Sequence, residues 1–196
     1  MSKKITIKPI KPIKREPGET VIFKDHPEFT PNVTPREMFE LGVFGGNYYR
    51  PISSGVTGTE LENQHGEFSS LGWWDNISDD HLTSSKCNVK INMCSVKAGS
   101  SLAAWEEKNW IIEQDPYGWV QWYCRFYAGR RSDDDTRQIS RWNKYTGPKS
   151  GRWKKNLINK LKKAGSEYDD FSISPVIRQG LLQWAYVVTP QDLMYL

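Results

Sequence analysis

The sequence predicts an α+β fold that is mainly α-helical, and two observations carry that prediction. From residue 100 onward, apolar residues recur at helical spacing between serine or proline starts and glycine ends. Between residues 42 and 97 the chain is instead rich in glycine, β-branched residues and short apolar pieces, a pattern typical of strands and structured loops. We therefore expect a helical C-terminal half packed on a small irregular or β segment.

The chain of 196 residues suits one domain with its own core. Its nine tryptophans add much buried area to a modest hydrophobic share of 37%. We expect a single globular domain at residues 20–196, preceded by an extended basic arm at residues 1–19. The arm holds the near-repeat Ile-Lys-Pro, and proline favours extended backbone. It is either a flexible tail or an arm laid on a partner.

The cysteine and hydropathy patterns suggest where the protein works. Three cysteines are too few and too sparse for a disulfide framework. No apolar run approaches the roughly 20 residues that span a bilayer, and no signal-peptide core follows the basic N-terminus. We expect an intracellular protein of the cytoplasm, nucleus or virion, without a membrane partner.

The first expected helix lies in "TPREMFELG". Thr34 is placed to cap it, Pro35 takes its first position, and Glu37 completes a capping box. The next stretch, residues 42–58, predicts a strand–turn–strand or a structured loop, and residues 87–96 predict a further strand.

The C-terminal half predicts six helical segments, each with its own start and stop signals. Asp115-Pro116 opens the second of them, and Ser132 caps the third. Three aspartates follow Ser132, and we interpret them as first-turn residues that stabilise the helix N-terminus rather than as metal ligands. In order, the expected segments begin near Ser101, Pro116, Asp133, Arg152, Pro175 and Pro190.

Positive charge is concentrated in residues 120–165, which contain 13 lysines and arginines against three aspartates. Arg137, Arg141 and Lys144 are spaced by four and three, so they form one stripe on their helix. The next helix repeats this design. Two neighbouring basic helices predict a surface that binds phosphates with strong salt dependence. The expected nucleic-acid-binding residues are Arg130, Arg131, Arg137, Arg141, Lys144, Arg152, Lys155, Lys162 and Lys163. For Arg130 and Arg131, bonding to carbonyls at the end of the preceding helix is an equal alternative.

Most helical tryptophans are expected to pack in the core. A ligand pocket is instead expected around Tyr48, Tyr49 and Arg50, where the chain is not helical, and Trp73 and Trp74 are candidates for an exposed stacking face.

Other site chemistry is sparse. A hydrolytic or lyase site built from His65, Glu67 and Asp75 is conceivable on residue type alone. Cys87 and Cys94 are six residues apart, unlike the close pairs of structural zinc sites. We expect no metal and no cofactor.

Four stretches resemble an uncharacterised protein family of bacteria, fungi, algae and large DNA viruses. They are "FGGNYYRPI", "DPYGWVQWYCRFYAGRRSDDDTRQISRW", "SGRWKKNLI" and "SPVIRQGLLQWAY". The resemblance implies a stand-alone module in which residues 44–50 and 119–142 belong to the defining architecture. It implies no activity, cofactor or catalytic residue.

These features together favour a non-enzymatic nucleic-acid-binding protein that contacts phosphates, and a larger assembly is one context in which it would act. Two alternatives stay open. One is an enzyme acting on an anionic substrate, and the other is an assembly module whose basic face meets an acidic protein.

Overall fold

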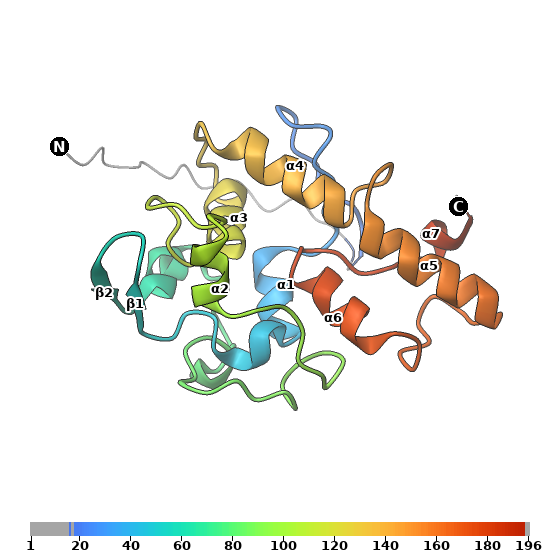
Figure 1. Ribbon diagram of the computed structural model, residues 1–196, viewed down its shortest axis with the longest axis horizontal. Helices are drawn as coiled ribbons and strands as arrows, with labels where there is room; N and C mark the ends of the chain where they lie inside the picture. Colours follow the sequence, from blue (N-terminus) through green and yellow to red (C-terminus); the bar gives the residue numbers. More distant parts are fainter. Residues whose placement is uncertain (1–15, 17, 195–196) are drawn as a thin grey trace.

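The computed structural model describes residue 16 and residues 18–194. The expected basic arm at residues 1–19 therefore lies almost entirely outside the described residues. The described part is mainly helical, with one small two-stranded sheet near its N-terminal end. This confirms the predicted α+β, mainly α class. In Figure 1, α4 and α5 follow one another along one edge of the view, and α6 lies beside α5.

The first helix, α1 (Pro35–Glu40), forms as the sequence predicts. The Glu37 amide donates to Thr34 Oγ1 at 3.3 Å, and the Thr34 amide donates to Glu37 Oε2 at 2.6 Å. Gly42 follows with a φ of 69°, and a Cβ there would lie 1.7 Å from the carbonyl oxygen of Ile91. Only glycine allows the chain to turn here against the neighbouring loop.

The strand prediction for residues 42–58 is right in kind but displaced. A short 3₁₀ turn at Val43–Gly46 comes first, and the hairpin pairs β1 (Ile52–Ser54) with β2 (Thr59–Leu61) in antiparallel register. The strand predicted at residues 87–96 is wrong, because that segment consists of turns and bends. Asn92 explains why, since its side chain accepts from the Gly45 amide and donates to the Val96 carbonyl. Such side-chain bonds replace a ladder of strand hydrogen bonds.

All six predicted C-terminal helical segments are present, with some starts and ends displaced. The third helix begins two residues later than expected, at Asp135. There Asp135 accepts from the backbone amide and hydroxyl of Ser132 at 2.9 Å each, as well as from the Trp122 indole. The observed helices are α2 (Leu102–Glu107), α3 (Trp119–Tyr127), α4 (Asp135–Tyr145), α5 (Arg152–Ala164), α6 (Pro175–Leu182) and α7 (Pro190–Met194).

The start of α3 shows how tertiary contacts displace a local signal. Asp115-Pro116 predicts a helix start, yet α3 begins at Trp119, after Gly118 with a φ of 85°. The Asp115 carboxylate is fully buried and bonds two arginines instead of capping the helix. Buried ion pairing has therefore taken the place of the cap.

The main core gathers around Phe29, which is completely buried. Its ring lies 5.1 Å from Trp142, 5.6 Å from Trp122 and 5.6 Å from Phe126, centroid to centroid. Such aromatic contacts account for much of the packing in a chain with a modest aliphatic content. The core thus holds a segment before α1 against α3 and α4.

A second, smaller apolar cluster lies where α5, α6 and α7 meet. Leu157, Ile158 and Leu161 from α5 form one side of it, as their spacing predicts. Helix α6 connects the two clusters, because Leu181 packs in the smaller one and Leu182 in the larger one. No helix among the described residues has the length and apolar character needed to cross a membrane.

Candidate functional site

Arg130 is buried and is not available to a ligand. It is 7% exposed, and its two terminal nitrogens donate to the two carboxylate oxygens of Asp115, each at 2.7 Å. This bidentate pair satisfies the guanidinium inside the protein. The prediction that Arg130 contacts phosphates is therefore wrong, because a carboxylate of the same chain already neutralises it.

Arg131 and Arg137 lie nearer the surface, and each is paired. Arg131 binds Asp25 at 2.6 Å, donates to the carbonyl of Phe126, and lies over the Phe126 ring at 3.7 Å. The carbonyl-bonding alternative for Arg131 is thus what the structure contains. Arg137 binds Asp134 within the first turn of α4. Asp134, one of the three aspartates that follow Ser132, therefore forms an ion pair.

Three other predicted cations converge on a single cavity of about 500 Å³. Arg141 and Lys144 reach it from α4, and Arg152 reaches it from the first turn of α5. Aromatic side chains form most of the remaining lining. They are Phe44, Tyr48, Trp105, Trp110, Trp119, Tyr145, Trp153 and Trp184. Among the described residues no aspartate or glutamate lines this cavity, which we call the tryptophan pocket.

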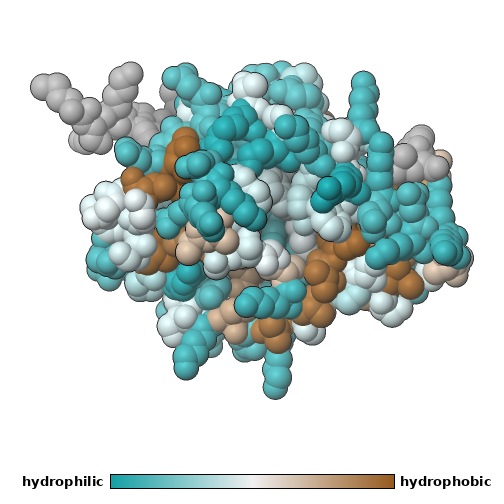
Figure 2. All heavy atoms as spheres, in the orientation of Figure 1, coloured by the Kyte–Doolittle hydropathy of each residue, from teal (hydrophilic) through white to brown (hydrophobic). Residues whose placement is uncertain are grey.

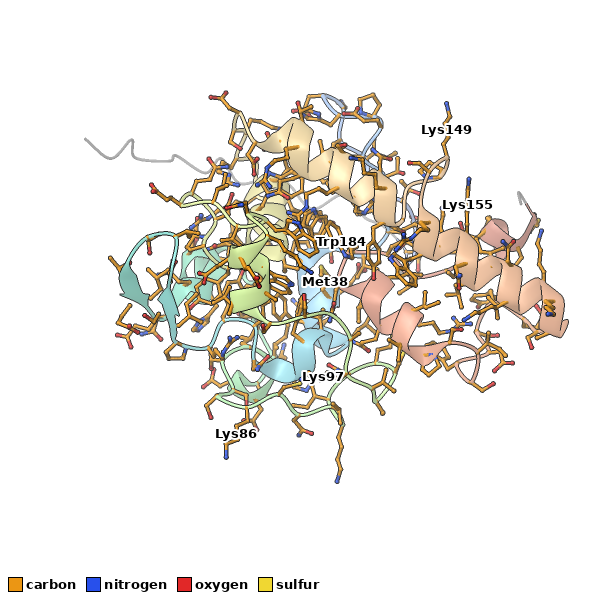
Figure 3. The ribbon with its side chains drawn as sticks, in the orientation of Figure 1. Met38, Lys86, Lys97, Lys149, Lys155 and Trp184 are labelled. Atoms are coloured by element: carbon orange, nitrogen blue, oxygen red, sulfur yellow. The ribbon has the colours of Figure 1, made fainter. Side chains whose placement is uncertain are left out.

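The tryptophan pocket is built from segments far apart in the sequence. Helix α2 supplies Trp105, the following loop supplies Trp110, and the chain just after α6 supplies Trp184. The Trp184 ring stacks on Tyr145 at 5.1 Å and lies 4.8 Å from Trp119. Figure 3 shows Trp184 between α2 and α4, near the middle of the face that Figure 2 presents.

Arg141 is the most enclosed cation of the pocket. Its guanidinium carbon lies 5.3 Å from the Trp110 ring and 5.4 Å from the Trp184 ring, and it donates to the Trp110 carbonyl and Gln138 Oε1. No carboxylate of the described residues lies within ion-pair distance of it. Burial, followed by the nearby Arg137 charge, lowers the pKa of Arg141 to about 10. An anion in the pocket would relieve this unfavourable environment.

The remaining predicted cations lie on the outer side of α5. Lys162 and Lys163 are exposed in its last turn, and Lys155 is partly exposed and donates to the Lys149 carbonyl at 2.7 Å. Figure 3 shows Lys149 and Lys155 projecting from the molecule beside α5, and Figure 2 shows hydrophilic residues gathered over α4 and α5. By contrast, Lys154 is buried and binds Asp192 at 3.3 Å.

Tyr48, Tyr49 and Arg50 do not line one common pocket as expected. Tyr48 lines the tryptophan pocket, where it is held by donating to the Tyr117 carbonyl at 2.6 Å. Tyr49 is completely buried and lines none of the cavities described here, so its predicted ligand contact is wrong. Tyr49 packs between Phe39 and other core rings. Arg50 lines a smaller neighbouring cavity.

The expected stacking face at Trp73 and Trp74 does not form. Both rings are partly buried against the main core; Trp73 stacks on Phe68 at 5.1 Å, and the Trp74 indole donates to the His65 carbonyl at 2.7 Å. The cavity is instead lined by tryptophans that the sequence assigns mainly to the core, among them Trp119, Trp153 and Trp184. The sequence signal that could have indicated this cavity was the mixture of arginine and tryptophan around residues 141–153.

The alternative catalytic residues have structural partners or lie apart from the tryptophan pocket. Glu67 binds Arg125 at 2.8 Å, which in turn binds Asp115. Cys87 is exposed and lines the smaller cavity with Arg50. Within residues 18–194, no three histidine, cysteine or acidic side chains are grouped so as to hold a metal ion.

A scan against models of known protein families, a search of curated proteins and a search of solved structures each found no match to this chain. The family resemblance drawn from the sequence stays a prediction.

Proposed function

We propose that this protein binds single-stranded nucleic acid without catalysing a reaction on it. The observation that carries the proposal is the tryptophan pocket, which combines five of the nine tryptophans with three cations and no carboxylate. A nucleotide has the complementary chemistry, since it joins a flat base to an anionic phosphate. Base–aromatic stacking and cation–phosphate contact are the two interactions that single-strand binding uses.

The enclosure of the pocket supports a single strand over a duplex. Its volume of about 500 Å³ falls within the range of small-ligand cavities. A base can enter such a cavity only after leaving its stack, and bases of single strands do so at lower cost. The exposed lysines of α5 extend the positive surface beyond the pocket, where they meet further phosphates.

Arg141 supports an anion as the occupant. It is partly buried beside two indole rings and has no carboxylate partner among the described residues. A phosphate would supply the missing charge, and bonds between arginine and phosphate are strong when water is excluded. The same residue supports a small organic anion as a second candidate ligand.

The test is a titration of the full chain with an oligothymidylate of about 12 nucleotides, followed by intrinsic tryptophan fluorescence. Because five tryptophans line the pocket, occupancy should quench the emission. We expect Kd to rise steeply between about 50 and 200 mM salt. Trp184→Ala and Arg141→Met should each weaken binding about tenfold or more.

Two matched variants control for folding and for general charge. Trp73→Ala removes a partly buried tryptophan outside the pocket, and Lys86→Ala removes an exposed lysine that Figure 3 shows on the opposite side of the molecule from Lys155. Both should leave Kd within about twofold. Undetectable binding at low salt contradicts the proposal. Equal binding by a mononucleotide and the oligomer selects the small organic anion instead.

A further inference from the structure

A second cavity adjoins the tryptophan pocket. It has a volume of about 290 Å³ and shares Phe44, Tyr48, Gly99, Ser100 and Trp105 with the larger one. Trp105 thus lies at the boundary between the two cavities. An elongated ligand in the tryptophan pocket can continue past this indole without leaving the protein surface.

The second cavity carries positive charge of its own. Arg50 and Lys97 line it, and no aspartate or glutamate does. In Figure 3, Lys97 lies on the opposite side of Trp184 from Lys149 and Lys155. Together with Arg141, Lys144 and Arg152 of the tryptophan pocket, Arg50 and Lys97 make five cations along the lining of the two adjoining cavities.

The second cavity is held in shape by bonds to its own backbone. The Arg50 guanidinium donates to the Asn47 carbonyl at 3.0 Å, and the Arg50 carbonyl accepts from the Tyr117 hydroxyl at 2.7 Å. Asn92 bridges the Gly45 amide and the Val96 carbonyl, next to Lys97. Within the described residues Arg50 has no carboxylate partner, so its charge is available to a ligand.

We propose that the second cavity is a subsite for the next nucleotide, so that one strand places adjacent nucleotides on either side of Trp105. Arg50 and Lys97 would then bind the phosphate of the second nucleotide. This inference rests on the proposed function, and it adds that full affinity requires a ligand of at least two nucleotides. Charge complementarity favours a polyanion over a partner with one charged group.

The experiment compares thymidine monophosphate, the dinucleotide and the tetranucleotide by tryptophan fluorescence on the full chain. With the native protein, affinity should increase about tenfold from the monophosphate to the dinucleotide. Arg50→Ala with Lys97→Ala should remove that increase and leave the monophosphate Kd unchanged. Lys97→Glu alone should reduce the increase in affinity from the monophosphate to the dinucleotide. Because Lys97 is exposed, this substitution should not disturb folding.

A matched control is Lys86→Ala with Lys90→Ala, which removes two exposed lysines that line neither cavity. It should retain the full gain in affinity with length. If the gain in affinity survives both in the Arg50→Ala/Lys97→Ala double variant and in Lys97→Glu, the second subsite is refuted and the proposed function stands. If none of the probes binds, both proposals are refuted.

Discussion

Arg130 and Arg141 are the same residue type on neighbouring stretches of chain, yet their surroundings give them different roles. Arg130 lies in the interior and shares the Asp115 carboxylate with Arg125. Arg141 lies between two indoles at a cavity and has no carboxylate within ion-pair distance among the described residues. A paired buried arginine holds structure together, whereas an unpaired one in a cavity suits an anionic ligand.

At the residue scale, Arg130→Ala should lower the free energy of unfolding by about 3–5 kcal/mol. The variant leaves the Asp115 charge buried with half of its partners removed. Urea unfolding followed by circular dichroism measures the change. Arg137→Ala removes a more exposed pair and should cost no more than about 1 kcal/mol. Equal losses of unfolding free energy in the two variants would show that the buried Arg130–Asp115 pair stabilises the fold no more than the more exposed pair does.

At the scale of elements, the basic flanks of α4 and α5 do not form one uniform surface. The stripe on α4 has its first arginine bound to Asp134 and its second turned toward Trp110 and Trp184. The lysines in the last turn of α5 are exposed and do not line the pocket. Under the proposed function, the pocket cations would bind a specific phosphate and the α5 lysines would attract phosphates in general.

This division predicts a particular salt dependence. Lys162→Ala with Lys163→Ala should weaken oligonucleotide binding uniformly across sequences and reduce the slope of log K against log salt by about 1–2, because fewer counterions are released. Binding of a mononucleotide should not change. The measurement is a fluorescence titration at several salt concentrations. An unchanged slope would exclude the last turn of α5 from the interface.

The helices were largely predictable from the sequence and the hairpin was predictable in kind, whereas the loops were not. Start and stop signals for α1 and α5 are local: the Thr34–Glu37 capping box forms, and Gly165 ends α5 in a left-handed conformation. The strand expected at residues 87–96 did not form because the Asn92 side chain bonds to the distant Gly45 amide and to the nearby Val96 carbonyl. Side-chain to backbone bonding of that kind depends on what packs nearby.

At the scale of the whole molecule, burial of weak acids predicts alkaline sensitivity. Burial raises the pKa of Cys124 to about 12 and that of Tyr117 to about 12, and it raises the pKa values of Tyr48, Tyr49 and Tyr186 as well. In the unfolded chain these groups lose their protons at their ordinary, lower pKa values. The unfolded state therefore binds fewer protons, and stability falls as pH rises from about 9 to about 12.

We expect the free energy of unfolding to fall by at least about 2 kcal/mol between about pH 8 and about pH 10.5. The lowered pKa of Arg141 acts in the opposite direction, but it is one group against several. Urea unfolding at a series of pH values measures the slope. Cys124→Ala should make the decline shallower, since it removes one raised acid. A flat profile in the native protein would contradict the burial of these side chains.

The sequence by itself determined the helical class, the order of the C-terminal helices and the concentration of positive charge. Those properties are local, because caps, periodicity and composition act within a few residues. Only the tertiary structure decided which cations are free and which aromatic rings line a cavity. Asp115 reaches Arg130 across 15 positions, and Trp105 and Trp184 meet at one pocket from opposite ends of the helical half. The spacing of residues along the chain does not reveal such contacts, because they depend on how the helices pack.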